Sequence, residues 1–157
     1  ADIVVNIQGD EPLIEPKVID DLVDALDADK SAVMATVVKR IATGEEFRDP
    51  NVVKVVIDKD WNALYFSRAP IPFRRDGKVT DHSGYFHHLG IYAYRKDFLL
   101  TYCRWPKSFL EEEEALEQLR VLEAGCRIKV VETSFETIGV DTPEDLIRVN
   151  EHLKSLK

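Results

Sequence analysis

Apolar residues near the start of the chain follow two different periodicities. Residues 3–7 form a short apolar run rich in β-branched side chains, a pattern typical of a strand buried on both faces. Pro16 then favours a helix over residues 17–28. The apolar residues of that helix recur at helical spacing on one face: Val18, Ile19, Leu22, Val23 and Leu26.

The middle of the chain predicts strands and a hairpin. Residues 32–38 have the pattern of a second strand, followed by a polar link. Residues 52–57 and 63–66 are predicted to pair as a hairpin through a turn at 58–60. Pro70 and Pro72 cannot both serve a central ladder, so we expect a loop to about residue 83, with a turn at Gly77.

The last part alternates strands with helices. We expect strands at 86–94 and 128–131 and helices at 97–103, 110–123 and 143–156, with Gly125 closing the long middle helix. This alternation favours an α/β three-layer sheet with an inserted hairpin. The length of 157 residues indicates one domain over 1–157.

A strand buried on both faces needs neighbours on each side, yet residues 3–7 begin almost at residue 1. We therefore expect a chain truncated at its N-terminus. The alternative is a native central strand at the start of the domain.

Composition narrows the possible partners. The net charge of −8 argues against nucleic acid, whose binding needs clustered Lys and Arg. An anionic substrate would need a positive patch or a divalent cation. No apolar run reaches the roughly 18 residues of a membrane span, and no signal peptide opens the sequence, so we expect no membrane partner and a cytoplasmic protein. Cys103 and Cys126 fit neither a disulfide framework nor a zinc site.

Two carboxylates follow predicted strands, where ligands bind in open α/β sheets. Asp10 follows the first strand beside Gly9, and Asp141 follows a short apolar stretch and precedes a helix. Together they could hold a Mg²⁺ ion that also binds phosphates. Alternatively, Asp10 is a turn residue and Asp141 complements a helix dipole before the N-cap Thr142.

Arginine and histidine residues also lie near predicted strand ends. Arg68, at a strand end, could clamp a carboxylate or phosphate, whereas Arg74 and Arg75 fit a solvated turn better. His87 and His88 should point to opposite faces of their strand, and with His82 they match no helical zinc motif.

The predicted helix over 110–123 has two faces of interest. Its acidic start suits the positive end of the helix dipole. Ala115, Leu116, Leu119 and Leu122 would form the core stripe, while Leu110, Glu114, Glu117 and Val121 share another face. That second face suggests a subunit or substrate contact; an ordinary exposed helix is the alternative.

Five segments resemble one enzyme family. They are VVNIQGDEP at residues 4–12, ALYFSR at 63–68, HLGIY at 88–92, LEQLR at 116–120 and GVDTPEDL at 139–146. In this order over the whole chain, they resemble the 3-deoxy-D-manno-octulosonate (Kdo) cytidylyltransferases, or CMP-Kdo synthetases.

The resemblance implies a nucleotide-sugar transferase-like (Rossmann-like) fold, a homodimer with a dimerisation helix, and conversion of CTP and Kdo to CMP-Kdo and pyrophosphate for lipopolysaccharide synthesis. It implies that Asp10 and Asp141 are the catalytic Mg²⁺ ligands. It further implies substrate-binding residues at the nucleotide–sugar junction and around the acidic sugar: Gln8, Pro12, Arg68, His88, Tyr92, Glu117 and Gln118.

The family's N-terminal strand and its basic, glycine-containing phosphate loop have no counterpart here. We therefore expect residues 1–157 alone not to make CMP-Kdo. In the implied mechanism the anomeric hydroxyl attacks the α-phosphorus in line, without a side-chain nucleophile. The alternatives are another acidic sugar, 8-amino-Kdo or a sialic acid, and a non-catalytic sugar-binding or dimerisation module.

Overall fold

A computed structural model describes residues 2–7, 14–75 and 84–134. Its strands form one six-stranded sheet, ordered β4-β3-β5-β2-β6, with β1 also pairing with β5. The elements in chain order are β1 (Ile3–Asn6), α1 (Pro16–Ala28), β2 (Ala32–Arg40), α2 (Gly44–Arg48), β3 (Lys54–Ile57), β4 (Ala63–Ser67), β5 (Phe86–Arg95), α3 (Lys96–Tyr102), α4 (Phe109–Glu114), α5 (Leu119–Glu123) and β6 (Arg127–Glu132).

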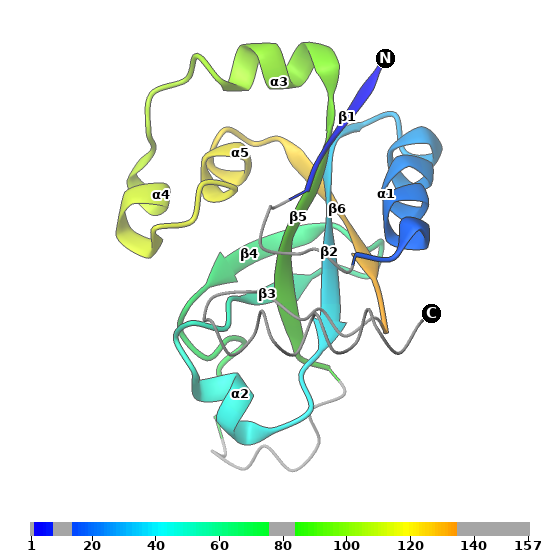
Figure 1. Cartoon of the computed structure of the whole chain (residues 1–157). Helices are drawn as coiled ribbons and strands as arrows, with labels where there is room; N and C mark the ends of the chain where they lie inside the picture. The colour runs from blue at the N-terminus through cyan, green and yellow to red at the C-terminus, as the bar shows by residue number, and fades with distance from the viewer. Residues whose placement is uncertain (1, 8–13, 76–83, 135–157) are drawn as a thin grey trace, which may run out of the picture.

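Helices cover both faces of the sheet, as expected for a three-layer α/β fold (Figure 1). On one face, α1 buries Val18, Leu22 and Leu26 against alternate residues of β2 and β5. On the other face, α3, α4 and α5 enclose a larger core around Met34, Tyr92, Tyr94, Leu119 and Val121. Alternation along each strand supplies one set of side chains to each core.

The strand directions define one functional edge of the sheet. β1 and β2 are each antiparallel to β5, and β6 is parallel to β2, so β1, β2 and β6 point the same way. Their carboxyl ends therefore lie along one edge. β1 pairs with residues 92–95 of β5, whereas β3 pairs with Phe86 and His87. His88 and Gly90 lie in the part of β5 between the residues that pair with β3 and those that pair with β1.

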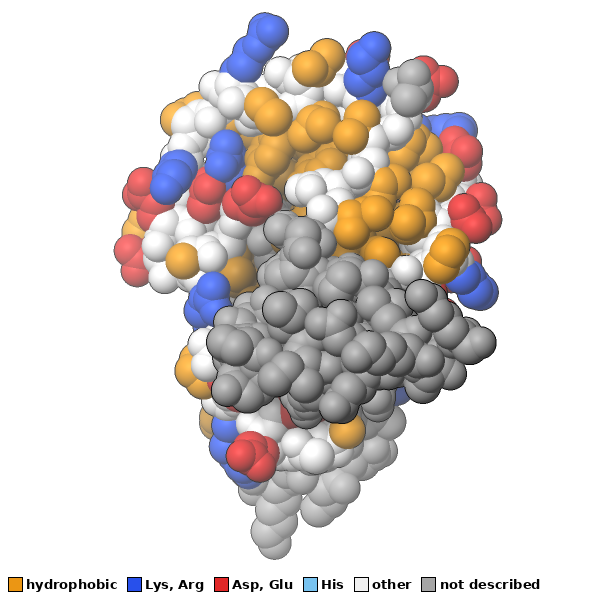
Figure 2. Space-filling view, viewed as in Figure 1, with side chains coloured by type: hydrophobic (Ala, Val, Ile, Leu, Met, Phe, Trp, Pro, Cys, Tyr) orange, Lys and Arg blue, Asp and Glu red, His pale blue; other side chains and the backbone are white. Residues whose placement is uncertain are grey.

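The expectation for residues 3–7 is wrong in one respect. β1 is only partly buried rather than covered on both faces, and Ile7 is 41% exposed. Figure 2 shows apolar side chains on this face of the molecule, over β1 and α1. The short apolar run identified a strand, but the sequence pattern could not show how much of it is covered.

The predicted hairpin is confirmed, since β3 and β4 are antiparallel neighbours. α2, by contrast, was missed in the polar link. Thr43 begins this helix by accepting a hydrogen bond from the Glu46 N–H at 3.1 Å, while the Glu46 carboxylate accepts from Ala42 N at 3.0 Å. The Thr-x-x-Glu spacing of a capping box was the available signal.

The single helix expected over 110–123 is wrong. α4 ends at Glu114, the next residue Ala115 has the left-handed conformation with φ 53°, and α5 begins only at Leu119. The two proposed helix faces therefore do not exist: Val121 is fully buried, Leu110 packs against the core, and Ala115 is exposed. The semi-apolar stripe that suggested a subunit contact is absent from these described residues. Gly125, with φ 74°, does follow the end of α5 as predicted.

Candidate functional site

The candidate site lies where the parallel strands end. Asn6, the last residue of β1, is opposite Tyr92 of β5. At the end of β6, the Thr133 N–H donates to the Val38 carbonyl, and Val38 is opposite His88. In the sequence, Asp10 comes four residues after the end of β1, and Asp141 comes nine residues after the end of β6. Gln8, Asp10, Pro12, His82 and Asp141 themselves lie outside the described residues.

His88 lies in the core below this edge. Its Nε2 is 2.9 Å from Thr36 Oγ1, and the Thr36 hydroxyl donates to the Ile91 carbonyl at 2.8 Å. Because that donation uses the only hydroxyl proton, Nε2–H of His88 is the donor to Thr36. Burial, with a smaller contribution from the charge of His87, lowers the pKa of His88 to about 3. His88 is therefore a neutral, oriented imidazole.

Tyr92 and Gln118 meet across the gap between the sheet and the α4–α5 connection. The Tyr92 hydroxyl donates to Gln118 Oε1 at 3.2 Å, and the Tyr92 ring lies 5.4 Å from the His88 ring. Gln118 is only 1% exposed, yet its Nε2 has no hydrogen-bond partner among the described residues. A buried, unpaired amide donor is costly unless a ligand or water satisfies it.

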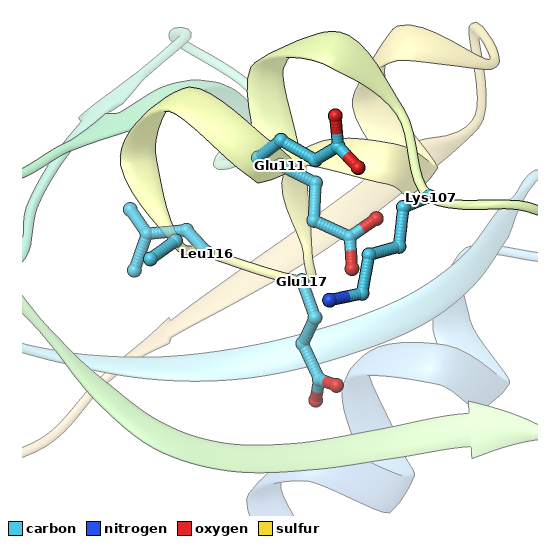
Figure 3. A pocket seen from close by; sticks show the side chains of 6 residues that line it. Lys107, Glu111, Leu116 and Glu117 are labelled. Carbon is cyan, nitrogen blue, oxygen red and sulfur yellow. The ribbon is translucent and has the colours of Figure 1, made fainter.

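Glu117 lies beside Gln118 but is exposed. It lines a hollow of about 340 Å³ with Lys107, Glu111 and Leu116, and Figure 3 shows its side chain extending away from the two helices. Burial, with smaller contributions from Tyr94 and from the Glu117 charge, raises the pKa of Tyr92. Burial and then the Glu117 charge raise the pKa of Tyr102 to about 12. The Tyr102 hydroxyl also donates to the main-chain carbonyl of Glu117 at 2.9 Å.

Arg68 follows β4 immediately, as predicted, but its guanidinium is already engaged. Nε donates to the Glu114 carbonyl at 2.9 Å and Nη1 to the Pro50 carbonyl at 3.2 Å. Its predicted contact with an acidic sugar stays a prediction, and it would require Arg68 to share or release one of these main-chain partners.

His87 and His88 point to opposite sides of β5, which confirms the alternation argument. His87 Nδ1 is 3.3 Å from the Glu46 carboxylate, away from Tyr92 and Gln118. Within residues 2–7, 14–75 and 84–134, no cluster of three or more His, Cys, Asp or Glu side chains could hold a metal ion.

Sequence reasoning missed Thr36 and Lys54, both fully buried. Each interrupts an apolar stretch with a single polar residue: Thr36 within residues 32–38 and Lys54 within 52–57. A lone polar side chain in an otherwise apolar strand must find a partner in the core, and that was the available signal.

Comparisons with known proteins show the family of the chain. The cytidylyltransferase family matches residues 1–133. Relatives named 3-deoxy-manno-octulosonate cytidylyltransferase from Pelobacter propionicus and Solibacter usitatus are 51% and 54% identical over 100% and 99% of this chain, which covers 65% and 61% of their lengths. The chain thus spans less than two thirds of these curated relatives.

Two solved structures are also similar. One, described as CMP:2-keto-3-deoxy-manno-octonic acid synthetase complexed with CTP, has a TM-score of 0.89 at 40% identity, covering 100% of this chain and 64% of that chain. The other, 4-diphosphocytidyl-2C-methyl-D-erythritol synthase from Anaerococcus prevotii, shares the fold, with a TM-score of 0.55 at 15% identity over 98% of this chain and 59% of that chain. None of the helices in the described part of the chain is long and apolar enough to cross a membrane. On the match over residues 1–133, the chain belongs to the cytidylyltransferase family.

Proposed function

We propose that the intact protein transfers the CMP group of CTP to Kdo, giving CMP-Kdo and pyrophosphate for lipopolysaccharide synthesis. The observation that carries the proposal is the meeting of Tyr92 with Gln118, from two motifs far apart in the sequence, with a Tyr92–Gln118 hydrogen bond of 3.2 Å and an unpaired buried amide. The names of relatives about half identical to the chain support this substrate pair.

The described residues would bind and orient the sugar. The Gln118 Nε2–H group can donate to a sugar oxygen, and the exposed Glu117 carboxylate can accept from sugar hydroxyls. The neutral His88 ring packs against the Tyr92 ring. Holding the anomeric hydroxyl in line with the α-phosphorus supplies much of the catalysis, because phosphoryl transfer depends mainly on positioning and electrostatics.

We also propose that Asp10 and Asp141 hold Mg²⁺. Asp10 follows the strand β1 beside Gly9, Asp141 follows the apolar stretch 138–140, and carboxylate oxygens are the donors that Mg²⁺ prefers. When bound, the ion would neutralise charge on the phosphate oxygens. Gln8 and Pro12, which belong to the segment after β1, are proposed to lie at the nucleotide–sugar junction.

The homodimer is a further part of the proposal. A largely apolar groove supports it. The groove is lined by Phe47, Pro70, Pro72 and Phe73, together with Gly44, Arg48 and Arg74. Phe73 is 86% exposed, and a large aromatic side chain in water favours a contact that would cover it. A second copy of the chain is the proposed occupant.

Pyrophosphate release by the intact protein tests the activity. We expect turnover with CTP, Kdo and Mg²⁺, slower turnover with 8-amino-Kdo or a sialic acid, and loss of turnover in chelator. Faster turnover with either of the other sugars would reassign the substrate. Binding of Kdo without pyrophosphate release, in the presence of CTP and Mg²⁺, would favour a sugar-binding module instead.

A further inference from the structure

Glu114, at the end of α4, is hydrogen-bonded to the end of β4 by both carboxylate oxygens. Oε1 accepts from the Ser67 hydroxyl at 2.6 Å, and Oε2 accepts from the Arg68 main-chain N–H at 2.9 Å. Arg68 returns the contact, since its guanidinium donates to the carbonyls of Glu114 at 2.9 Å and Ala115 at 3.5 Å. We call this reciprocal set of Ser67, Arg68 and Glu114 the clamp.

The sheet side of the clamp is itself fixed. Lys54 is fully buried, and its Nζ donates to the Arg68 carbonyl at 2.6 Å and to the Asp49 carbonyl at 2.8 Å, as well as to the Val52 carbonyl. A buried ammonium that donates to three main-chain carbonyls fixes the positions of the residues that carry those carbonyls. The clamp therefore joins α4 to a rigid part of the sheet rather than to a free loop.

The helix side of the clamp sets the direction of the chain into the candidate site. Ala115 is left-handed, with φ 53° and ψ 49°, a conformation that costs an alanine free energy and persists only when its surroundings impose it. Arg68 binds the carbonyls of residues 114 and 115, on both sides of this Ala115 kink. Glu117 and Gln118 follow two and three residues later.

An ion pair between Arg120 and Glu111 holds the two helices together but does not reach the sheet. Arg120 of α5 donates to both carboxylate oxygens of Glu111 of α4, at 2.7 and 2.6 Å. This pair fixes the angle between α4 and α5. The clamp is the charged contact that ties the end of α4 to β4, and it therefore governs where the α4–α5 connection sits above Tyr92.

We propose that Glu114 is a positioning residue for the acidic sugar: through Ser67 and Arg68 it fixes the Ala115 kink, so that Gln118 meets Tyr92 and Glu117 faces the substrate. Nothing requires Glu114 to touch the sugar. The substrate named here rests on the proposed function; the positioning of Gln118 does not.

Glu114→Gln in the intact protein tests the proposal. Both carboxylate oxygens of Glu114 accept hydrogen bonds, and in the variant an amide NH₂ group, which can only donate, replaces one of them. We expect KM for Kdo to rise by about tenfold or more while KM for CTP stays within about twofold. Glu113→Gln, an exposed neighbour on α4, is the matched control and should keep the parent values. Unchanged sugar KM, or equal effects on both substrates with a matching fall in Tm, would overturn the proposal.

Ser67→Ala provides a milder variant in case Glu114→Gln folds poorly. It removes the Ser67 hydroxyl that donates to Glu114 and keeps the Arg68 N–H contact, so we expect a smaller rise in sugar KM. In the double variant the two effects should be strongly non-additive, because both act through one contact. Full additivity would mean that Glu114 and Ser67 do not act as one clamp.

Nuclear magnetic resonance tests the positioning without relying on turnover. In the unliganded protein, Glu114→Gln should shift the side-chain amide signals of Gln118 and the ring signals of Tyr92, whereas Glu113→Gln should not. If the parent protein does not act on Kdo, the proposed function fails and this measurement still decides the clamp. Unmoved Gln118 and Tyr92 signals would overturn it.

Discussion

His88 is uncharged in the folded protein, because burial lowers its pKa from 6.5 to about 3. Between these two values the unfolded chain binds a proton that the folded protein does not, so the free energy of unfolding falls as the pH is lowered. Above pH 6.5 His88 is neutral in both the folded and the unfolded protein, so it does not make the free energy of unfolding depend on pH. Between pH 8 and 5 we expect His88 to lower the free energy of unfolding by about 2 kcal/mol.

Urea denaturation at several pH values, compared with His88→Gln, isolates this effect. The variant should lack the His88 contribution to the slope while keeping that of His87, whose pKa is also lowered, chiefly by burial. Parallel pH dependences for parent and variant would show that His88 does not titrate in this way.

Asp10 and Asp141 carry the clearest prediction for catalysis. In the intact protein, Asp10→Asn and Asp141→Asn should each lower kcat by about a hundredfold or more, because each loses a charged oxygen proposed to hold Mg²⁺. The Tm should change little if the carboxylates act on chemistry rather than folding. Activity within about tenfold of the parent at saturating Mg²⁺ would refute the metal assignment.

At the scale of elements, the end of α5 depends on one glycine. Gly125 has φ 74°, and a Cβ added there would meet open space, so Gly125→Ala adds backbone strain without a clash. We expect a loss of about 1 kcal/mol, measured by denaturant unfolding. Gly125→Asn, which tolerates this conformation better, should lose less. Equal stability of the alanine variant and the parent would show that the end of α5 relaxes freely.

The local pattern of apolar residues predicted most helices and strands, because each buries one face and a helix and a strand differ in the spacing of the residues on that face. α1, β2, β4, β5 and β6 lie within a few residues of their expected bounds. The helix expected over 110–123 failed for a non-local reason. Alanine has the highest intrinsic helix propensity, yet Ala115 is left-handed, and this conformation accompanies contacts with Arg68, 47 residues earlier in the chain.

At the scale of the whole molecule, the dimer proposal predicts that Phe73→Asp yields a monomer, because a charge would have to be buried in the apolar groove. Light scattering of the intact protein at micromolar concentration measures this directly. Phe109→Asp is the matched control, since Phe109 is 67% exposed on α4, outside the groove. A monomeric parent, or a Phe73→Asp variant that stays dimeric, would contradict the proposed interface.

The amino-acid sequence was enough to predict the α/β class, most of the strand and helix order, and the segments that belong to the candidate site. These follow from periodicity and from short motifs, which are local properties of the chain. It also suggested Asp10 and Asp141, which lie outside the described residues and stay predictions.

Tertiary structure decided which of these segments meet. It brought Gln118 to Tyr92 at 3.2 Å and turned Arg68 onto main-chain carbonyls. It also buried Thr36 against His88, 52 residues away in sequence. The physical reason is that hydrogen bonds of buried polar groups are satisfied by whichever residues the fold brings near, and no local pattern encodes that choice.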